Sequence, residues 1–494
     1  MNYLELFQND LKLIIPELFL STGIIILLVA GVLFNRENTA LISNISWLSI
    51  LTLIISLLLM LNHPFETEIV LNGMLLINNF TLIISSIILF SSIIVLLMSF
   101  DYYKDEKITA YEYSILIMLA ALGLILLISS YDFLALYLAI ELQSLTLYVL
   151  ATFKRNSEFS TEAGLKYFIL GALSSGILLF GISLIYGLTG STNYETINHL
   201  LIGVSLENNE NLIGLSIGIL FIAVALLFKL AAAPFHMWAP DVYEGSPTIV
   251  TAFFAIVPKI GILSVFITIF LETFYGLINQ WQHIVIFCAI TSMIIGAIGA
   301  VTQKKFKRLL AYSAIGHIGY ILIGIASATP EGVQGLLLYI IVYIIMSINI
   351  FSLYLSLYDK NTSIKIKNIS ELSGLSKENG ILAITLAIAV LSMAGIPPLA
   401  GFASKFYIFL AAIESSMYVL AVIGVLTSVI AAVYYIRLIK IMYFENTSNN
   451  VSYKTIDLNK SIILATTLFF ILFFMVNPSY LLILTHELAL NLSL

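Results

Sequence analysis

Residues 391–406 of this sequence read LSMAGIPPLAGFASKF, and residues 228–247 read FKLAAAPFHMWAPDVYEGSP. Both segments put proline inside or at the end of a long apolar run. The residues that interrupt the two runs are Pro234, Gly395, Pro397, Pro398 and Gly401. Proline removes an intrahelical hydrogen bond and clashes with the preceding turn, so we expect a broken helix at each place. Irregular backbone within a membrane is tolerated only inside protein or beside a water-filled cavity.

The composition is that of a membrane protein. Of the 494 residues, 60% are hydrophobic and 10% are charged, and the mean hydropathy is +1.04. Soluble domains carry about 25% charged residues, which a globule needs on its surface. The long unbroken apolar runs indicate helices, because a β-barrel would show short alternating segments. The sequence therefore predicts an all-α polytopic membrane protein.

Several function classes are excluded by residue counts. The 22 Lys and Arg against 28 Asp and Glu give a net charge of −6 and no basic domain for nucleic acid. The single Cys288 leaves no disulfide, Cys-ligated zinc or iron–sulfur cluster. The histidines His236, His283 and His317 offer no symmetric pair for haem. We therefore expect this chain to bind no cofactor and no metal.

About 20 apolar residues are needed to cross a bilayer, and on that measure we predict about fourteen spans. They cover residues 13–34, 40–61, 75–100, 110–129, 131–152, 164–188, 211–236, 247–270, 283–301, 309–328, 332–357, 379–410, 415–440 and 460–485. The polar stretch 188–211 is predicted to be an ordinary connection. No soluble domain is predicted.

Charges in the loops predict the orientation. Lys and Arg follow spans one, three, five, nine, eleven and thirteen, which places those loops on the cytoplasmic or matrix side. Both termini then lie on the opposite, outer face. The loop after span seven is an exception, because it carries Asp241 and Glu244.

The two broken helices are five spans apart, so they run in opposite directions. This predicts two inverted five-helix repeats, each with a broken helix, and such pairs are typical of transport sites. The predicted parts are a three-helix segment at 1–109, a first repeat at 110–270, a second repeat at 283–440 and a last helix at 441–494. The alternative is that the prolines only kink their helices.

Ionisable residues lie at the centre of several spans. A charge there costs about 2.5–3.5 kcal/mol, so it needs a partner, water or a function. Glu141 lies centrally in span five and shares its helix face with Tyr137, Ser144 and Tyr148. The other candidates are Lys166, Lys229, His236, Lys259, His317 and Lys405.

Structural roles compete with functional ones for these residues. His236 and His317 are equally well explained as hydrogen-bonded packing residues, and Lys166 as a lysine that reaches the basic face. Static ion pairs do not explain the rest, because central lysines outnumber central acids. Desolvation disfavours the charged form of an unpaired buried lysine, so its proton can leave. This pattern predicts a proton relay.

Five segments together resemble a known family. They are YDFLALYLAIELQSLTLYVL at 131–150, LKYFILGALSSG at 165–176, FKLAAAPFHMWAPDVYEGSPT at 228–248, KRLLAYSAIGHIGYILIG at 307–324 and LSMAGIPPLAGFASKF at 391–406. They resemble, in the same order, the antiporter-like membrane subunits of respiratory NADH:ubiquinone oxidoreductase (complex I). The likeness covers roughly residues 10–440. That family has fourteen helices with an inverted repeat, in agreement with the pattern above.

The resemblance implies roles for individual residues. Glu141 and Lys229 match an interacting pair on helices five and seven, and Lys259 matches the central lysine of helix eight. Lys405 matches the lysine beside the break in helix twelve, which is expected to exchange protons with the far side. Lys166 and His317 match positions whose roles are less certain.

The resemblance also implies a function and a setting. The chain is expected to translocate protons in the membrane arm, driven by NADH oxidation and quinone reduction elsewhere. FMN, iron–sulfur clusters and ubiquinone are then expected in partner subunits, and the partners are other membrane-arm subunits, neighbouring antiporter-like subunits and lipids. The composition favours an organelle-encoded protein of the mitochondrial inner membrane over a bacterial one. A free-standing cation/proton antiporter and a non-conducting structural subunit remain as alternatives.

Overall fold

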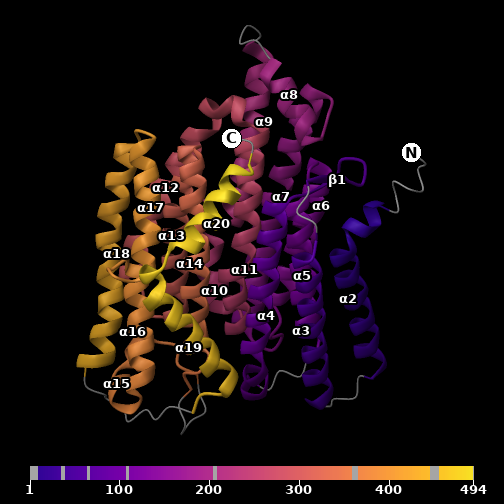
Figure 1. Ribbon diagram of the computed structural model, residues 1–494. Coiled ribbons are helices and arrows are strands. Elements are labelled where there is room, and N and C mark those ends of the chain that lie inside the picture. Colours follow the sequence, from indigo (N-terminus) through magenta and orange to yellow (C-terminus); the bar gives the residue numbers. More distant parts are fainter. Residues whose placement is uncertain are drawn as a thin grey trace. The chain divides into compact units, whose positions relative to one another are not determined.

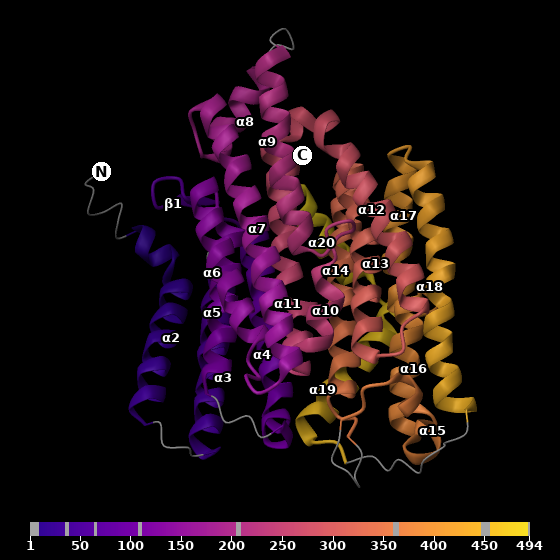
Figure 2. The same ribbon diagram turned by 180° about the vertical axis from the view of Figure 1, so that it is seen from behind.

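The computed structural model describes residues 9–34, 39–63, 67–106, 111–203, 209–358, 365–445 and 455–492. These residues fold almost entirely into helices (Figures 1 and 2). Thirteen described helices are long and apolar enough to cross a membrane, and two shorter apolar helices accompany them. Each of the fourteen predicted spans coincides with a helix or a pair of helices, so the all-α polytopic fold is confirmed.

The elements of the first seven spans follow one another in chain order, together with one small sheet and the short helices α8 and α10, which do not span. They are α2 (Ile15–Leu33), α3 (Thr39–Leu61), β1 (Glu68–Val70), β2 (Leu75–Ile77), α4 (Asn79–Glu106), α5 (Glu112–Ser129), α6 (Phe133–Ala151), α7 (Glu158–Thr189), α8 (Tyr194–Gly203), α9 (Asn209–Lys229) and α10 (Trp238–Gly245). The remaining spans follow. They are α11 (Thr248–Ile267), η1 (Thr268–Thr273), η2 (Tyr275–Leu277), α12 (Ile278–Val301), α13 (Phe306–Ser327), α14 (Pro330–Tyr354), η3 (Ile369–Leu372), α15 (Leu375–Glu378), α16 (Gly380–Ala394), α17 (Ala400–Glu414), α18 (Tyr418–Phe444), α19 (Leu458–Phe473), η4 (Phe474–Val476) and α20 (Ser479–Leu490).

The helices fall into two compact units. The first contains residues 1–230, 257–281 and 491–494, and the second contains residues 231–256 and 282–490. In the first unit α7 and α9 lie side by side, and α5 packs against α6. In the second unit α13 and α14 are buried along nearly their whole length, and α16, α17 and α18 pack around them.

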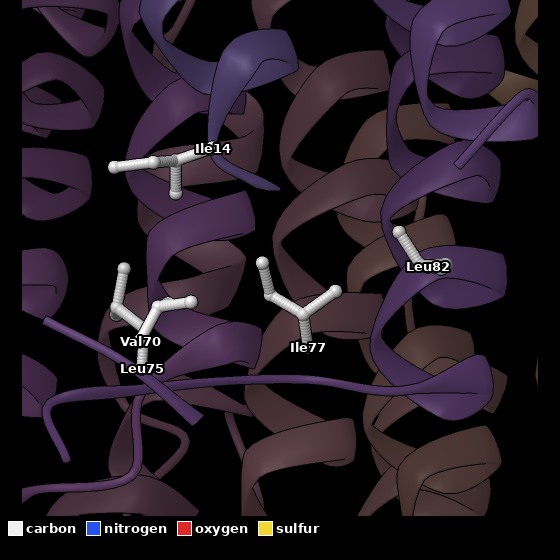
Figure 3. Packing of buried hydrophobic residues seen from close by; sticks show 5 residues of the cluster. All are labelled: Ile14, Val70, Leu75, Ile77 and Leu82. Atoms are coloured by element: carbon white, nitrogen blue, oxygen red, sulfur yellow. The ribbon is translucent and has the colours of Figure 1, made fainter. Parts of the chain in front are cut away.

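A small antiparallel sheet joins the ends of several helices in the first unit. β1 pairs with β2 in the register Glu68 to Ile77, and Val70, Leu75 and Ile77 pack with Ile14 and Leu82 (Figure 3). The hairpin is continued by a backbone hydrogen bond from Tyr131 to Met74. The sequence did not predict this sheet, because its short strands lie between long apolar runs.

Two of the helices begin at a residue whose side chain caps the first turn. Asp132 accepts a hydrogen bond from the Leu134 amide at 2.7 Å, so the short joint at 129–131 does separate two helices. Thr329 caps α14 in the same manner, and Pro330 is its first residue.

Two connections differ from their predictions. The stretch 188–211 contains the helix α8, which is amphipathic and too short to be found by apolar length. The predicted span 460–485 is divided into α19 and α20, because Asn477 and Pro478 interrupt it after a short 3₁₀ turn.

Candidate functional site

The first broken helix ends at Lys229, where the chain leaves the first unit. Ala231 has a φ of +60°, in the left-handed region, and the helix does not resume until Trp238. The freed backbone groups have partners on α12. The Ala233 amide donates to Ser292 Oγ at 2.7 Å, and the Ala233 carbonyl accepts from Thr291 Oγ1 at 2.8 Å. Side chains of a neighbouring helix therefore stabilise the irregular backbone, as a break at membrane depth requires.

Lys229 contacts the polar face of α6 that the sequence predicts. Its Nζ donates to Ser144 Oγ at 2.7 Å, while the Ser144 hydroxyl donates to the Ile140 carbonyl at 2.6 Å. Glu141 lies one turn earlier on the same face, within electrostatic reach of Lys229. Its Oε1 is buried and has no hydrogen-bond partner among the described residues. The lysine is thus held by the hydroxyl, and a buried carboxylate oxygen within its electrostatic reach has no hydrogen-bond partner among the described residues.

The structure also places the other lysine candidates of the first unit. Lys259 follows Pro258 inside α11. Although lysine is ordinarily charged and exposed, this one is only 6% exposed. Lys166 instead forms a pair with Glu162 one turn away at 2.7 Å, and the two side chains are 43% and 61% exposed. Lys166 is thus paired with a carboxylate of its own helix.

In the second broken helix, a lysine of the second half binds the end of the first half. α16 ends at Ala394, Gly395 has a φ of +87°, and α17 begins at Ala400. Lys405 on α17 is 6% exposed, and its Nζ donates to the Ala394 carbonyl at 2.9 Å. This carbonyl lies at the negative end of the first half-helix, which attracts a cation. The charge also lies 4.9 Å from the centre of the Tyr320 ring, a cation–π distance.

His317 lies in a ring of hydroxyl groups within the second unit. Its Nδ1 is 2.7 Å from Tyr339 Oη, and its Nε2 is 3.1 Å from Tyr435 Oη. The same Tyr435 hydroxyl is hydrogen-bonded to Ser313. His317 is only 3% exposed, so both ring nitrogens have polar partners without bulk water.

A small cavity lies between these two groups. It has a volume of about 10 Å³, and its lining includes His317, Lys405, Tyr320, Ser313 and Tyr435. A cavity of about 10–15 Å³ is the smallest that holds one water molecule. His317 and Lys405 therefore line one polar space of the size of a single water.

His236 lies in the irregular segment after Pro234 and is half-buried. Its Nδ1 is buried and has no hydrogen-bond partner in the part of the chain that the structure describes. His236 belongs to the second unit and Lys229 to the first, so the structure does not show them as one site.

The acidic segment after span seven, with Asp241 and Glu244, forms an ion cluster with the basic residues Lys305 and Arg308 after span nine. Glu244 on α10 pairs with Lys305, and Arg308 Nη1 donates to Asp241 Oδ1 at 3.1 Å and to Glu244 Oε2 at 3.2 Å. Lys307 Nζ donates to the Ser246 carbonyl at 2.6 Å. Burial raises the pKa of Glu244, but hydrogen bonds and charges from Lys305 and Arg308 outweigh it, so this pKa lies below its usual value.

Tyr339 and Tyr435 were less visible in the sequence than the lysines and than Ser144, which shares the predicted polar face of Glu141. Tyr339 and Tyr435 lie in apolar helices and are 22 and 118 residues from His317, so only the fold brings them together. Their one signal is that several tyrosines stand inside α14 and α18. No group of three or more metal-ligating side chains occurs within the described ranges.

Comparison with known proteins gives consistent results. The family described as NADH:quinone oxidoreductase/Mrp antiporter matches residues 130–431, which contain both broken helices. NADH-ubiquinone oxidoreductase chain 2 of Marchantia polymorpha is 50% identical over 496 residues, covering 99% of this chain and 100% of its own. NADH-quinone oxidoreductase subunit N of Pelagibacter ubique is 46% identical, covering 96% and 98%.

A solved structure supports the same assignment. A chain of respiratory complex I from Thermus thermophilus superposes with a TM-score of 0.78 at 26% identity, covering 95% of this chain and 98% of that one. Fold, broken helices and central lysines thus define an antiporter-like membrane subunit. Within that class, the chain belongs to the chain 2/subunit N family of NADH:quinone oxidoreductase, as the sequence predicted.

Proposed function

We propose that this chain translocates protons as a membrane-arm subunit of an NADH:quinone oxidoreductase. Its relatives are named as subunits of that enzyme, and complex I contains its structural neighbour. NADH oxidation and quinone reduction then take place in partner subunits that hold FMN and iron–sulfur clusters. This chain contributes the proton path, and other membrane-arm subunits lie beside it.

The observation that carries this proposal is the contact of Lys229. The lysine is hydrogen-bonded to Ser144, while Glu141 on the same helix face keeps a buried oxygen without a partner. Lys229 therefore has two alternative acceptors, a hydroxyl and a carboxylate. On the carboxylate the lysine retains its proton, because the opposite charge stabilises the ammonium. On the hydroxyl the ammonium is stabilised less, and the proton can pass on.

The energies involved are compatible with such a switch. Moving one charge against the membrane potential costs about 2.3 kcal/mol per 100 mV. A change of one pKa unit in a carrier corresponds to about 1.36 kcal/mol. A change of partner at Lys229 that shifts its proton affinity by about two such units therefore supplies the required amount. Lys259 and Lys405 are the proposed later carriers, with His317 beside Lys405.

The proposed setting is a multi-pass protein of the mitochondrial inner membrane. The basic loops then face the matrix and both termini face the intermembrane space. The plant organelle relative supports a mitochondrial origin, and the bacterial relative represents the alternative.

The test uses the assembled complex in proteoliposomes. Ser144→Ala removes the hydroxyl that holds Lys229, and Lys229→Met removes the carrier. We expect both variants to assemble and to lose proton uptake, Lys229→Met almost entirely and Ser144→Ala by roughly tenfold, since a hydrogen bond to a charged group is worth about 1.5–3 kcal/mol.

Thr146→Ala is the matched control, because it removes a buried hydroxyl from the same helix that donates to the Gln143 carbonyl rather than to a candidate carrier. Normal proton uptake in an assembled Lys229→Met complex would show that the chain has a structural role. Sodium-dependent transport by the isolated chain, without redox partners, would support an antiporter instead.

A further inference from the structure

A groove lined by both apolar and charged side chains lies at the start of the first unit, far along the chain from the central lysines. It has a volume of about 660 Å³ and lies among the helical residues 9–13 before α2, the end of α3 and the strand β1. This volume is within the range of about 300–1,000 Å³ typical of small-molecule sites. Its lining residues are Asn9, Asp10, Lys12, Leu13, Ile15, Pro16, Leu59, Asn62, His63, Glu68 and Ile69.

The groove carries charged groups of both signs. Asp10 and Glu68 are acidic, whereas Lys12 and His63 are basic. Asp10 is fixed in place, because its Oδ2 accepts from the Leu71 amide at 3.1 Å. His63 is 8% exposed, and its Nε2 lies 3.1 Å from the Leu13 carbonyl. A ligand with a phosphate and an ammonium group matches this arrangement better than a purely anionic or purely cationic one.

The groove lies where two membrane-spanning helices end. α2 begins at Ile15 and α3 ends at Leu61, and both are among the candidate spans. Exposed apolar side chains continue from the groove along both helices. Leu18 lies one turn beyond Ile15 on the same face, and Leu58 lies one turn before Asn62. A ligand held here by its polar end would therefore lay an apolar part against the helices.

We propose that this groove binds the headgroup of an aminophospholipid, such as phosphatidylethanolamine. Lys12 contacts the phosphate, Asp10 and Glu68 contact the ammonium, and the acyl chains follow the exposed faces of α2 and α3, while His63 stays on the Leu13 carbonyl. A soluble zwitterion of the same charge pattern would leave those apolar faces uncovered. The site is independent of the proposed proton path.

The experiment uses the assembled complex reconstituted with photoreactive lipids that carry a diazirine in an acyl chain. Phosphatidylethanolamine is compared with phosphatidylglycerol, which has the phosphate but no ammonium group. Labelled peptides are then identified by mass spectrometry. We expect phosphatidylethanolamine to label peptides of α2 and α3 around Ile15 and Leu58, and phosphatidylglycerol to label them roughly tenfold less, the change expected for one lost charged contact.

Two variants test the named contacts. Lys12→Ala and Glu68→Ala should each reduce this labelling by roughly tenfold, while Lys377→Ala, an exposed lysine elsewhere, should leave it unchanged. NADH oxidation by each variant verifies assembly. Free phosphoethanolamine in excess should compete weakly, because it lacks acyl chains.

Equal labelling by the two lipids in the wild-type complex would overturn the proposal, and this comparison needs no variant to fold. Labelling that is unchanged in Lys12→Ala and Glu68→Ala would also overturn it. A partner subunit cross-linked to the groove in place of lipid would show that the surface is a protein interface. Full competition by phosphoethanolamine would assign the groove to a soluble zwitterion.

Discussion

Among single residues, Gly395 is required by the position of a lysine side chain. Its φ of +87° is in the left-handed region, and a Cβ added there would lie 2.9 Å from Lys405 Cδ. We expect Gly395→Ala to destabilise the protein by at least about 1 kcal/mol and to displace Lys405 from the Ala394 carbonyl. Proton uptake should fall more than NADH oxidation.

The control for this change is Gly380→Ala at the start of α16, where an added Cβ meets no atom within 4 Å. Thermal unfolding and proton uptake of the two complexes provide the measurement. Equal behaviour of the two variants would contradict the view that the turn at Gly395 positions Lys405.

The sequence revealed the charged residues of the site, but it did not reveal which groups each of them contacts. Glu141 and Ser144 could be placed on one face because helical spacing is local. The Lys229 contact with Ser144 spans 85 residues, and that of His317 with Tyr435 spans 118. Such pairs depend on the packing of several helices, so no local pattern predicts them. The roles of these residues in proton transfer remain predictions.

At the scale of elements, α10 is attached to the start of α13 by charge. Lys305, Lys307 and Arg308 stand at the N-terminal end of α13, where the helix dipole disfavours cations. Asp241 and Glu244 on α10 offset this cost. Arg308 is nine residues from His317, about 14 Å along the helix. The acidic loop after span seven is therefore explained by pairing with a basic loop on the same side.

This cluster predicts a pH-dependent attachment. The pKa of Glu244 is lowered in the folded protein, so its contribution to stability is present above its ordinary value of 4.5 and is lost as the pH falls through the lowered one. We expect Glu244→Gln to speed hydrogen exchange in α10 and to lower the unfolding temperature at pH 7. The difference from wild type should shrink below about pH 4.

Glu378→Gln, an exposed acid in α15, is the control and should leave the exchange of α10 unchanged. A difference between Glu244→Gln and wild type that grows on acidification would have the wrong sign. It would show that Glu244 is stabilising in its protonated form.

At the scale of the whole molecule, long apolar helices were predictable and short elements were not. The fourteen spans follow from the length that a bilayer requires, and the breaks follow from Pro234, Pro397 and Pro398. The hairpin β1–β2 and the helix α8 are too short for that criterion, and they depend on contacts with other helix ends. Pro478 has the same physical effect as the other prolines, but it lies near the end of the last span.

The last prediction concerns coupling through the complete complex. Lys259 is buried in the middle of α11, next to Pro258, and α11 is almost wholly enclosed by protein. Lys259→Met keeps the volume and removes the charge. If electron transfer drives protons through this lysine, the variant should lower both proton uptake and the quinone reduction coupled to it. We expect each rate to fall by roughly tenfold or more, because a missing carrier raises the barrier by more than about 1.4 kcal/mol. The measurement is the rate of NADH-driven quinone reduction and of acidification in the same vesicles, with Met98→Leu, at a buried methionine of α4, as the control. Normal acidification by an assembled Lys259→Met complex would remove Lys259 from the path and leave the membrane arm to conduct protons by another route.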